Sequence, residues 1–370
     1  MKRILFFVKL PPPVNGATTM YKNIIENPLL VLNYKCKVIP LHHAKTIQNQ
    51  GKVNLCKFFR MVYYSIRLML VLFTFRPHLI YFSLSIKGFS FYRDVFYISI
   101  IKLFSNSRLV FHQHAKGIKE ICKNPFNRFW LRYVYKNAFV ICLSELLTYD
   151  LKPVYNREPY IVSNAIPLEV PILAPKKGKR GVTIIFVSNL NKEKGVLDYI
   201  DAISLLDSKV PLHALIIGAE GDISKDTIVK YIQSKGLSEQ VKYLGPVFGR
   251  DKFNYLLESD IFVFPTFLKE ETWGLVILEA MQCGLPVIST REGAIPDIID
   301  EGITGFLVEK QRPEIIASKM ALLINNPELR QSMGQKGREK FLQKYTLHIF
   351  HNNIYHTFKD ILENNYESFN

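Results

Sequence analysis

Short apolar runs separated by helix-length stretches recur along the chain. In the first half the candidate strands are Arg3–Leu10, Cys36–Leu41, His78–Phe82, Arg108–His112, Phe139–Leu143 and Pro159–Val162. A second series starts afresh with Val182–Val187, His213–Gly218, Val241–Leu244, Ile261–Phe264, Pro286–Ser289 and Gly305–Val308. Because the intervals leave room for helices, each series predicts a parallel, doubly wound sheet. We therefore expect an α/β chain with two Rossmann-like domains facing a central cleft, since ligands bind at the carboxyl ends of such sheets.

The composition changes between the two series. Residues 167–180 hold three prolines, and four basic residues crowd into Lys176–Arg180, which is typical of a linker. At 370 residues the chain suits two domains. We predict an N-terminal domain over residues 1–167, a linker over 168–180 and a C-terminal domain over 181–344. The apolar spacing of Tyr345–Asn364 predicts a final helix, which on this pattern alone packs on either domain.

The distribution of charge is more informative than its sum of +16. Residues 1–170 hold 24 Lys and Arg against 7 Asp and Glu, a net +17, whereas residues 171–370 hold 24 against 25, a net −1. This asymmetry indicates attraction of the first domain to a polyanion or an anionic membrane. An apolar content of 48% argues against disorder.

Two further features indicate the compartment. Five scattered cysteines without C-x-x-C spacing are typical of thiols in a reducing environment and predict no zinc site. The apolar run Ile4–Val8 is too short for a signal-peptide core. We expect a cytoplasmic protein.

Two glutamates stand eight positions apart around a predicted strand-to-helix turn. Glu271 lies in a polar loop, Gly274 at the helix entrance and Glu279 about two turns into the helix. A helix start offers free N–H groups and partial positive charge to a phosphate, and Gly274 lets a ligand approach the backbone. Glu279 would then accept hydrogen bonds from a ribose diol, and Glu271 would meet a sugar. The pattern predicts a nucleotide-sugar site.

These residues resemble the Glu-x7-Glu motif of the retaining GT-B glycosyltransferases of family 4, also called group 1. The similarity continues through Gly284–Thr290 and Gly302–Val308. The resemblance implies a GT-B fold, a last helix (residues 345–370) that crosses back onto the first domain, and donor contacts from the backbone of Gly274, Leu275 and Val276. It also implies same-face attack, in which the departing phosphate takes the acceptor's proton.

A lysine loop follows the first strand of the second domain. Lys194 precedes Gly195 at a predicted helix start, so its ammonium group can approach a diphosphate beside free N–H groups. The loop is similar to the family's Arg…Lys-Gly loop, in which two cations neutralise the leaving diphosphate. Asn189 stands where the family has the arginine, so one charge is missing or is supplied by another basic residue.

Two first-domain segments follow predicted strands. Gly16 opens a helix after a proline-rich loop, where donor phosphate or acceptor can approach the backbone. His112 and His114 have no third ligand of suitable spacing for zinc. The resemblance implies that a histidine at this strand end contacts the transferred sugar, with His114 the better match and His112 the second; either is otherwise a core histidine.

Two second-domain segments take their roles from the resemblance alone. Tyr243–Val247 is similar to the family's base-binding segment, which places Gly245 and Val247 at the nucleobase without distinguishing uracil, guanine and adenine. Glu292–Asp297 resembles the family's glycine loop, with Asp297 in place of Glu.

Two basic aromatic segments raise the question of a membrane. In Lys57–Phe75 the basic residues fall within one arc of a helix. Arg128–Lys136 likewise combines basic and aromatic residues. The longest uncharged stretch, Leu68–Phe75, is too short to span a bilayer. A basic amphipathic helix can lie on an anionic leaflet, and the alternative is a pair of core helices with basic outer faces.

The sequence therefore predicts a retaining, metal-independent hexosyltransferase with catalytic His114, Glu271 and Lys194 and without a cofactor. The donor is a nucleoside-diphosphate-sugar of the UDP or GDP type, and the acceptor a glycan or lipid-linked sugar in cell-surface polysaccharide synthesis. No Asp-x-Asp occurs, so the metal-clamp route has no support. We expect a peripheral protein on the inner membrane face that binds no nucleic acid. The alternatives are a nucleotide-sugar epimerase of the same fold and a basic, nonenzymatic membrane or nucleic-acid binder.

Overall fold

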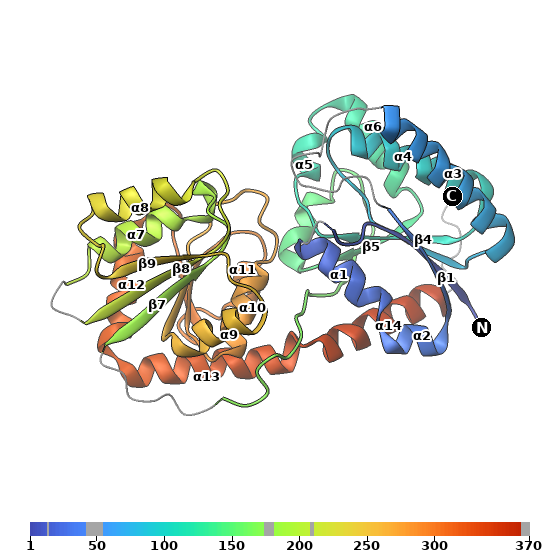
Figure 1. The fold of residues 1–370 in the computed structure, drawn as a ribbon. Helices are drawn as coiled ribbons and strands as arrows, with labels where there is room; N and C mark the ends of the chain where they lie inside the picture. Colours follow the sequence, from blue (N-terminus) through green and yellow to red (C-terminus); the bar gives the residue numbers. More distant parts are fainter. Residues whose placement is uncertain (13–14, 42–54, 174–180, 208–210, 364–370) are drawn as a thin grey trace. The chain divides into compact units, whose positions relative to one another are not determined.

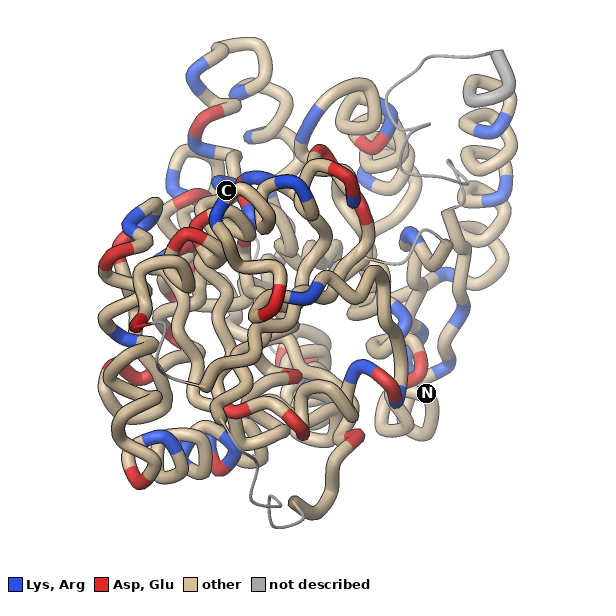
Figure 2. Tube along the Cα trace, turned by 60° about the vertical axis from the view of Figure 1, so that its left-hand side comes forward, with Lys and Arg blue, Asp and Glu red and all other residues tan. Residues whose placement is uncertain are grey.

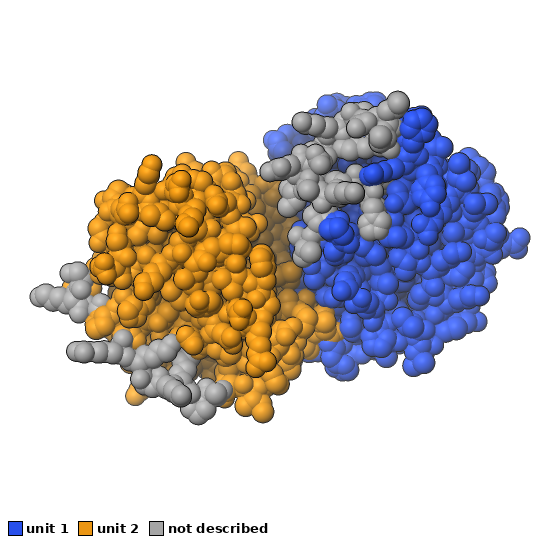
Figure 3. Space-filling model, in the orientation of Figure 1, with its two compact units in different colours: residues 1–164, 348–370 blue, residues 165–347 orange. Residues whose placement is uncertain are grey.

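The structure is a computed structural model that describes residues 1–12, 15–41, 55–173, 181–207 and 211–363. It divides into two compact units, drawn in Figure 3. Unit 1 comprises residues 1–164 and 348–370, and unit 2 comprises residues 165–347. Each unit is a parallel sheet with helices on both faces (Figure 1).

Unit 1 contains a six-stranded sheet of order β2-β1-β3-β4-β5-β6. Its strands are β1 (Arg3–Val8), β2 (Lys35–Pro40), β3 (Leu79–Phe82), β4 (Arg108–Gln113), β5 (Ala138–Cys142) and β6 (Tyr160–Ile161). Its helices are α1 (Gly16–Ile25), α2 (Pro28–Asn33), α3 (Leu55–Phe75), α4 (Gly88–Phe104), α5 (Ile118–Ile121), α6 (Pro125–Tyr135), the 3₁₀ turn η2 (Glu145–Asp150) and α14 (Leu347–Glu363).

Unit 2 repeats the plan with a sheet of order β12-β11-β10-β7-β8-β9. Its strands are β7 (Val182–Val187), β8 (Leu212–Ile217), β9 (Val241–Gly245), β10 (Ile261–Phe264), β11 (Val287–Thr290) and β12 (Gly305–Val308). Its helices are η3 (Lys192–Lys194), α7 (Val196–Ser204), α8 (Lys225–Ser234), α9 (Gly249–Glu258), α10 (Leu275–Gln282), α11 (Ile295–Ile298), α12 (Pro313–Asn325) and α13 (Pro327–Lys344).

All twelve predicted strands are present, with ends that differ by at most two residues. The central strands are apolar on both faces because helices cover both sides of a parallel sheet, as in β1, where Ile4 to Val8 are fully buried. The predicted α/β class with two doubly wound sheets is confirmed.

The C-terminal helix α14 packs on unit 1. Phe358 is buried against the rings of Phe6 and Tyr81, with centroid distances of 6.4 and 5.7 Å. The Asn27 side-chain amide donates to the carbonyl of His351 at 2.8 Å. Residues 348–363 therefore complete the core of the unit in which the chain begins.

The structure describes only part of the predicted linker over residues 168–180. Its first residues are not a free linker, because they are hydrogen-bonded to unit 2. Val170 is buried, and its amide and that of Glu169 donate to Oε1 of Gln282. Arg338 of α13 donates to the carbonyls of Val170 and Pro171. Residues 165–173 thus belong to unit 2, and residues 174–180 lie outside the described part of the chain.

Candidate functional site

The order of strands in unit 2 places a crevice beside β7. The chain runs from β7 outward through β8 and β9 and then returns to β10 on the other side of β7. At such a reversal the loops after neighbouring strands diverge, and ligands bind at the carboxyl edge. The loop after β7 carries Lys194 and the loop after β10 carries Glu271, so both predicted residues lie at this switch point.

Lys194 and Glu271 form an ion pair. The ammonium group of Lys194 donates to Oε2 of Glu271 at 2.5 Å, and both side chains are largely buried, with 19% and 11% of their surfaces exposed. The Lys194 ammonium also lies 5.4 Å from the centre of the Phe264 ring. A backbone bond of 2.8 Å from Phe267 to the carbonyl of Glu193 ties the two loops together.

A glycine allows these loops to approach. Gly195 has a φ of +82° where η3 passes into α7. A Cβ at this position would lie 2.2 Å from the carbonyl oxygen of Pro265, in the loop after β10. Any side chain would therefore push apart the loops that carry Lys194 and Glu271.

The N-terminus of α10 faces the same edge without a side-chain cap. Gly274 precedes the helix with a φ of +75°, and no side chain hydrogen-bonds to this helix end. Leu275 and Val276 are half-buried. The first amides of a helix have no intrahelical partner and carry partial positive charge, which makes this turn suitable for a phosphate.

The Glu292–Asp297 loop packs behind this turn. Gly293 has a φ of +56°, and a Cβ there would lie 2.4 Å from the carbonyl oxygen of Glu271. The amide of Ala294 donates to the carbonyl of Thr272 at 2.9 Å. The buried carboxylate of Glu292 pairs with Lys310. The predicted glycine loop thus supports the backbone around Glu271.

Glu279 has one occupied oxygen and one buried, unsatisfied oxygen. Lys252 of α9 donates to Oε1 of Glu279 at 2.6 Å. Oε2 of Glu279 is buried and has no hydrogen-bond partner. Burial raises the pKa of the Glu279 carboxyl, and Lys252 opposes that shift. Lys252 was not predicted from the sequence, where the only signal is a lysine next to Phe253 in an amphipathic helix.

The other predicted donor residues occupy the same edge of the sheet. Asn189 is exposed in the loop after β7. Gly245 ends β9 with a φ of +77° and accepts a bond of 3.0 Å from the amide of Gly218, and the half-buried Val247 follows it. Their roles at the nucleobase and the diphosphate stay predictions.

The rings of the two histidines of unit 1 form a close, tilted pair. The ring centroids of His112 and His114 are 4.1 Å apart, and the His114 ring meets that of Tyr21 edge-on at 5.1 Å. Nδ1 of His112 lies 3.0 Å from the Tyr81 hydroxyl, and both ring nitrogens of His114 are buried. Burial lowers the pKa of both, that of His114 to about 3, so both rings are neutral at pH 7. His112 is a core histidine, whereas His114 lies just beyond the end of β4.

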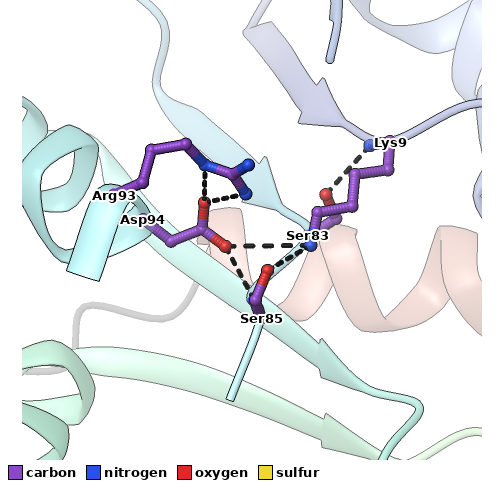
Figure 4. A network of polar contacts seen from close by, with 5 residues as sticks. All are labelled: Lys9, Ser83, Ser85, Arg93 and Asp94. Atoms are coloured by element: carbon purple, nitrogen blue, oxygen red, sulfur yellow. Dashed lines mark hydrogen bonds and ion pairs between the residues drawn. The ribbon is translucent and has the colours of Figure 1, made fainter. Parts of the chain in front are cut away.

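Unit 1 has a switch point of its own, between β1 and β3, and a polar network fills it (Figure 4). Lys9 follows β1 and donates its ammonium to the Ser85 hydroxyl at 2.5 Å and its amide to Ser83 at 2.9 Å. The fully buried Asp94 accepts from the Ser85 amide and from Arg93. Burial lowers the pKa of Lys9, and Asp94 opposes that shift. The sequence did not predict this network.

Gly16 begins α1, as predicted. The preceding Asn15 caps the helix: its side chain accepts from the Thr18 amide, and Thr18 accepts from the Asn15 amide, each at 3.0 Å. The end of α1 is therefore already capped by side chains, unlike that of α10. Among the described residues, no group of three or more His, Cys, Asp or Glu side chains could hold a metal ion.

Comparison with known proteins relates the second half of the chain to one family. The family model described as "Glycosyl transferases group 1" matches residues 173–340. Over 163 residues the chain is 32% identical to N-acetyl-alpha-D-glucosaminyl L-malate synthase of Bacillus anthracis, in an alignment that covers 44% of this chain and 41% of that protein. The chain spans 64% and 38% of the length of the next two curated relatives it matches.

Two solved structures share the fold over nearly the whole chain. A glycosyltransferase from Rickettsia africae ESF-5 aligns with a TM-score of 0.79 at 17% identity, covering 98% of this chain and 99% of that one. Anabaena HepE in complex with UDP and glucose aligns with a TM-score of 0.70 at 18% identity, covering 97% and 100%. These likenesses confirm the predicted GT-B fold.

Proposed function

We propose that the protein transfers a sugar from a nucleoside-diphosphate-sugar to a glycan or a lipid-linked sugar, because residues 173–340 match the family model of the group 1 glycosyl transferases. The observation that carries the proposal is the switch point of unit 2, where Lys194, Glu271 and the uncapped start of α10 lie together. This edge combines a cation, a carboxylate and free amides, which are the groups that a diphosphate and a sugar require.

Lys194 and α10 would stabilise the leaving diphosphate. Negative charge grows on this group as the glycosidic bond breaks, and fixed donors lower the energy of that state most when they are already in place. The ion pair with Glu271 holds Lys194 at the edge before the donor arrives. No Asp-x-Asp occurs in the sequence, and the proposed transfer therefore relies on Lys194 and helix polarity rather than on a metal.

Glu279 would bind the ribose. Its unsatisfied Oε2 costs free energy while it lies buried, and a diol that donates to it removes that cost. Lys252 favours the ionised carboxyl, which is the form that accepts two hydrogen bonds. Glu271, which is released from Lys194 as the phosphate binds, would accept from a sugar hydroxyl.

The acceptor and the stereochemistry complete the proposal. We assign acceptor binding to unit 1, where His114 and the Lys9 network border the carboxyl edge of the first sheet, and we place the reaction in cell-surface polysaccharide synthesis. The retention of configuration follows from the Glu-x7-Glu resemblance, in which the departing phosphate takes the acceptor's proton. The donor is of the UDP or GDP type, and UDP, which is bound in the structure of Anabaena HepE, is the first nucleotide to test.

A ligand screen followed by a bond assay tests the proposal. UDP, GDP and ADP are each added to the full chain with and without EDTA, and the unfolding temperature is measured. The matching nucleotide at 100 times its Kd should add about 2.7 kcal/mol, with EDTA present or absent. The corresponding nucleotide sugar and candidate acceptors are then analysed by mass spectrometry for a new glycosidic bond, and by NMR for its anomeric configuration.

Three results would contradict the proposal in different ways. If the nucleotide stops raising the unfolding temperature when EDTA is added, only the metal-independent part of the proposal would be contradicted. An epimerised donor without a glycosidic product would identify a nucleotide-sugar epimerase of the same fold. Protection by no nucleotide would leave the edge of unit 2 without its proposed ligand, in favour of a nonenzymatic binder.

A further inference from the structure

Three neighbouring helices of unit 1 expose a continuous aromatic surface to solvent. We propose that this α3–α4–α6 surface docks on an anionic membrane leaflet, with the protein peripheral on the cytoplasmic side. In Figure 1 the three helices lie side by side over one face of the first sheet. The proposal concerns this surface of unit 1 and does not depend on the reaction proposed for unit 2.

Helix α3 is apolar on two opposite sides. Tyr64, Leu68, Val71 and Leu72 pack into the core of unit 1. The outer side exposes Phe59, Tyr63, Ile66, Leu70 and Phe73, each with more than half of its surface accessible. Their spacing of three or four residues places them in one stripe. A surface helix of a soluble protein ordinarily presents a polar stripe there. The exposed stripe of α3 is apolar and is not the basic outer face that the alternative, a core helix, would present.

Helices α4 and α6 extend the stripe into a surface. Phe89, Tyr92, Phe96 and Leu103 form an exposed stripe on α4, and Phe126 and Phe129 are exposed on α6. The rings of Phe73 on α3 and Phe104 on α4 lie 5.8 Å apart, and those of Tyr92 on α4 and Phe126 on α6 lie 6.1 Å apart. The Tyr92 hydroxyl donates to the side chain of Asn127 at 2.7 Å. The exposed rings are therefore contiguous across all three helices.

The clustering is far from random. Within the described residues, 12 aromatic side chains are exposed, and 10 of them lie on these three helices. Scattered exposed apolar residues are normal, whereas a large contiguous patch indicates a binding surface for protein or membrane.

The charge around the surface favours a membrane over a second copy of the chain as the binding partner. The three helices contain one acidic residue, Asp94, which is fully buried and paired with Arg93. Figure 2 shows α3, the helix that begins beside a grey trace, with blue and no red positions. A second copy of the same surface would bring like charges together, and an apolar surface with cations at its margin is complementary to an anionic lipid interface.

A basic groove continues the surface where α6 ends. It has a volume of about 1100 Å³, and its lining includes Arg132 and Lys136 from the end of α6 together with Lys152 and Arg157, against one acidic residue, Glu158. On α6, Arg132 follows Phe129 at three positions and so lies on the same side, and Lys136 caps the end of the helix. Apolar side chains that enter the acyl boundary would thus stand beside cations that meet lipid phosphates.

The helix lies in the interface rather than across the bilayer. Phe58–Phe75 is long and apolar enough to span a membrane, with a mean hydropathy of 1.5 over 18 residues. Spanning would remove Leu68 and Leu72 from the core of unit 1, where they are at most 3% exposed. The exposed stripe can enter the outer part of a leaflet while the opposite side stays packed.

Vesicle partitioning of the full chain tests the proposal. Vesicles contain either phosphatidylcholine alone or a mixture with phosphatidylglycerol, and flotation measures the bound fraction. The aromatic variant is Phe59→Gln/Leu70→Gln/Phe129→Gln, and the charge variant is Lys136→Gln/Lys152→Gln. The matched control in unit 2 is Phe248→Gln/Lys230→Gln/Lys242→Gln, which removes an exposed ring and two exposed cations.

The parent and the control should bind the mixed vesicles and release them at high salt. Both surface variants should bind the mixed vesicles at least about tenfold more weakly than the parent. Their circular dichroism and unfolding temperature should be unchanged. Equal binding of the aromatic variant, or equal binding to both kinds of vesicle, would overturn the proposal. So would a dimer in lipid-free solution that the aromatic variant dissociates, since the surface would then belong to a second copy.

Discussion

At the scale of single residues, Glu279 offers the most direct test of the donor site. Glu279→Ala removes the buried acceptor and should weaken nucleoside diphosphate binding by about 1.5–3 kcal/mol. Titration calorimetry of the variant and the parent measures the difference. Glu239→Ala, at an exposed position of unit 2, is the control and should bind as the parent does. Equal affinities of the Glu279 variant and the parent would remove Glu279 from the ribose.

Lys194 should matter for turnover more than for affinity. Lys194→Ala is expected to reduce kcat about 100-fold while leaving the binding of the free nucleoside unchanged, because its charge acts on the diphosphate. Lys192→Ala changes an exposed lysine in the same short turn and is the matched control. Full activity in the Lys194 variant would place the phosphate cation elsewhere.

The paired, buried histidines should make unit 1 sensitive to acid. Burial lowers the pKa of His114 from 6.5 to about 3, so below pH 6.5 the unfolded chain binds a proton that the folded chain does not. Stability that is present above pH 6.5 is therefore lost as the pH falls, by about 1.4 kcal/mol per pH unit for each such group. Urea unfolding between pH 6.5 and 4.5 measures the slope.

His114→Phe removes the titrating group but keeps a ring of similar size. Its stability should depend on pH less steeply than that of the parent, whereas His213→Gln, at an exposed position of β8, should follow the parent. An unchanged slope in His114→Phe would show that another group carries the acid sensitivity.

The sequence was sufficient to predict those site residues that stand in a recognisable local pattern. Lys194, Glu271 and Gly274 each lie in the loop that follows a strand, so the rule that ligands bind at carboxyl ends was enough to find them. Lys252 and Lys9 were missed because their significance depends on Glu279 and Asp94, which lie 27 and 85 positions away and meet them only in the folded chain.

At the scale of elements, the contact between the β7 and β10 loops predicts an unequal pair of glycine substitutions. Gly195→Ala combines a positive φ with a Cβ 2.2 Å from the Pro265 carbonyl and should destabilise unit 2 by about 3 kcal/mol. Gly236→Ala has a φ of +69° but no atom within 4 Å, so its cost should be about 1 kcal/mol. Denaturant titration compares them. Equal losses would mean that the loops adjust freely.

The helices and strands could be predicted from the hydrophobic pattern, but which side of each helix is buried could not. Strands of a parallel sheet are short apolar runs that are easy to recognise near its centre. The edge strands β2 and β9, and β8 beside β9, keep enough apolar positions to be found despite their exposed polar residues. The stripe on α4 was missed because Phe89, Tyr92 and Phe96 alternate with equally apolar core residues. Only packing reveals which side of such a helix is covered.

At the scale of the whole molecule, α14 should determine the stability of unit 1 alone. Phe358→Ala removes a fully buried ring that contacts Phe6 and Tyr81, at a cost of about 3–5 kcal/mol. Thermal unfolding should show an earlier transition for unit 1, while the nucleotide still protects unit 2. Lys359→Ala, the exposed neighbour, is the control. A uniform shift of both units would show that they unfold together.

The return of α14 to the unit where the chain begins also sets an order of events during translation. Residues 1–164 leave the ribosome first, yet their core lacks Phe358 and Ile361 until all of unit 2 has been synthesised. Unit 2 is one continuous segment of the chain, so it can complete its fold before α14 is available to unit 1. In that interval the nascent chain holds a sheet that α14 does not yet cover, beside an aromatic surface. We expect the first half of the protein to be the part that nascent-chain chaperones bind.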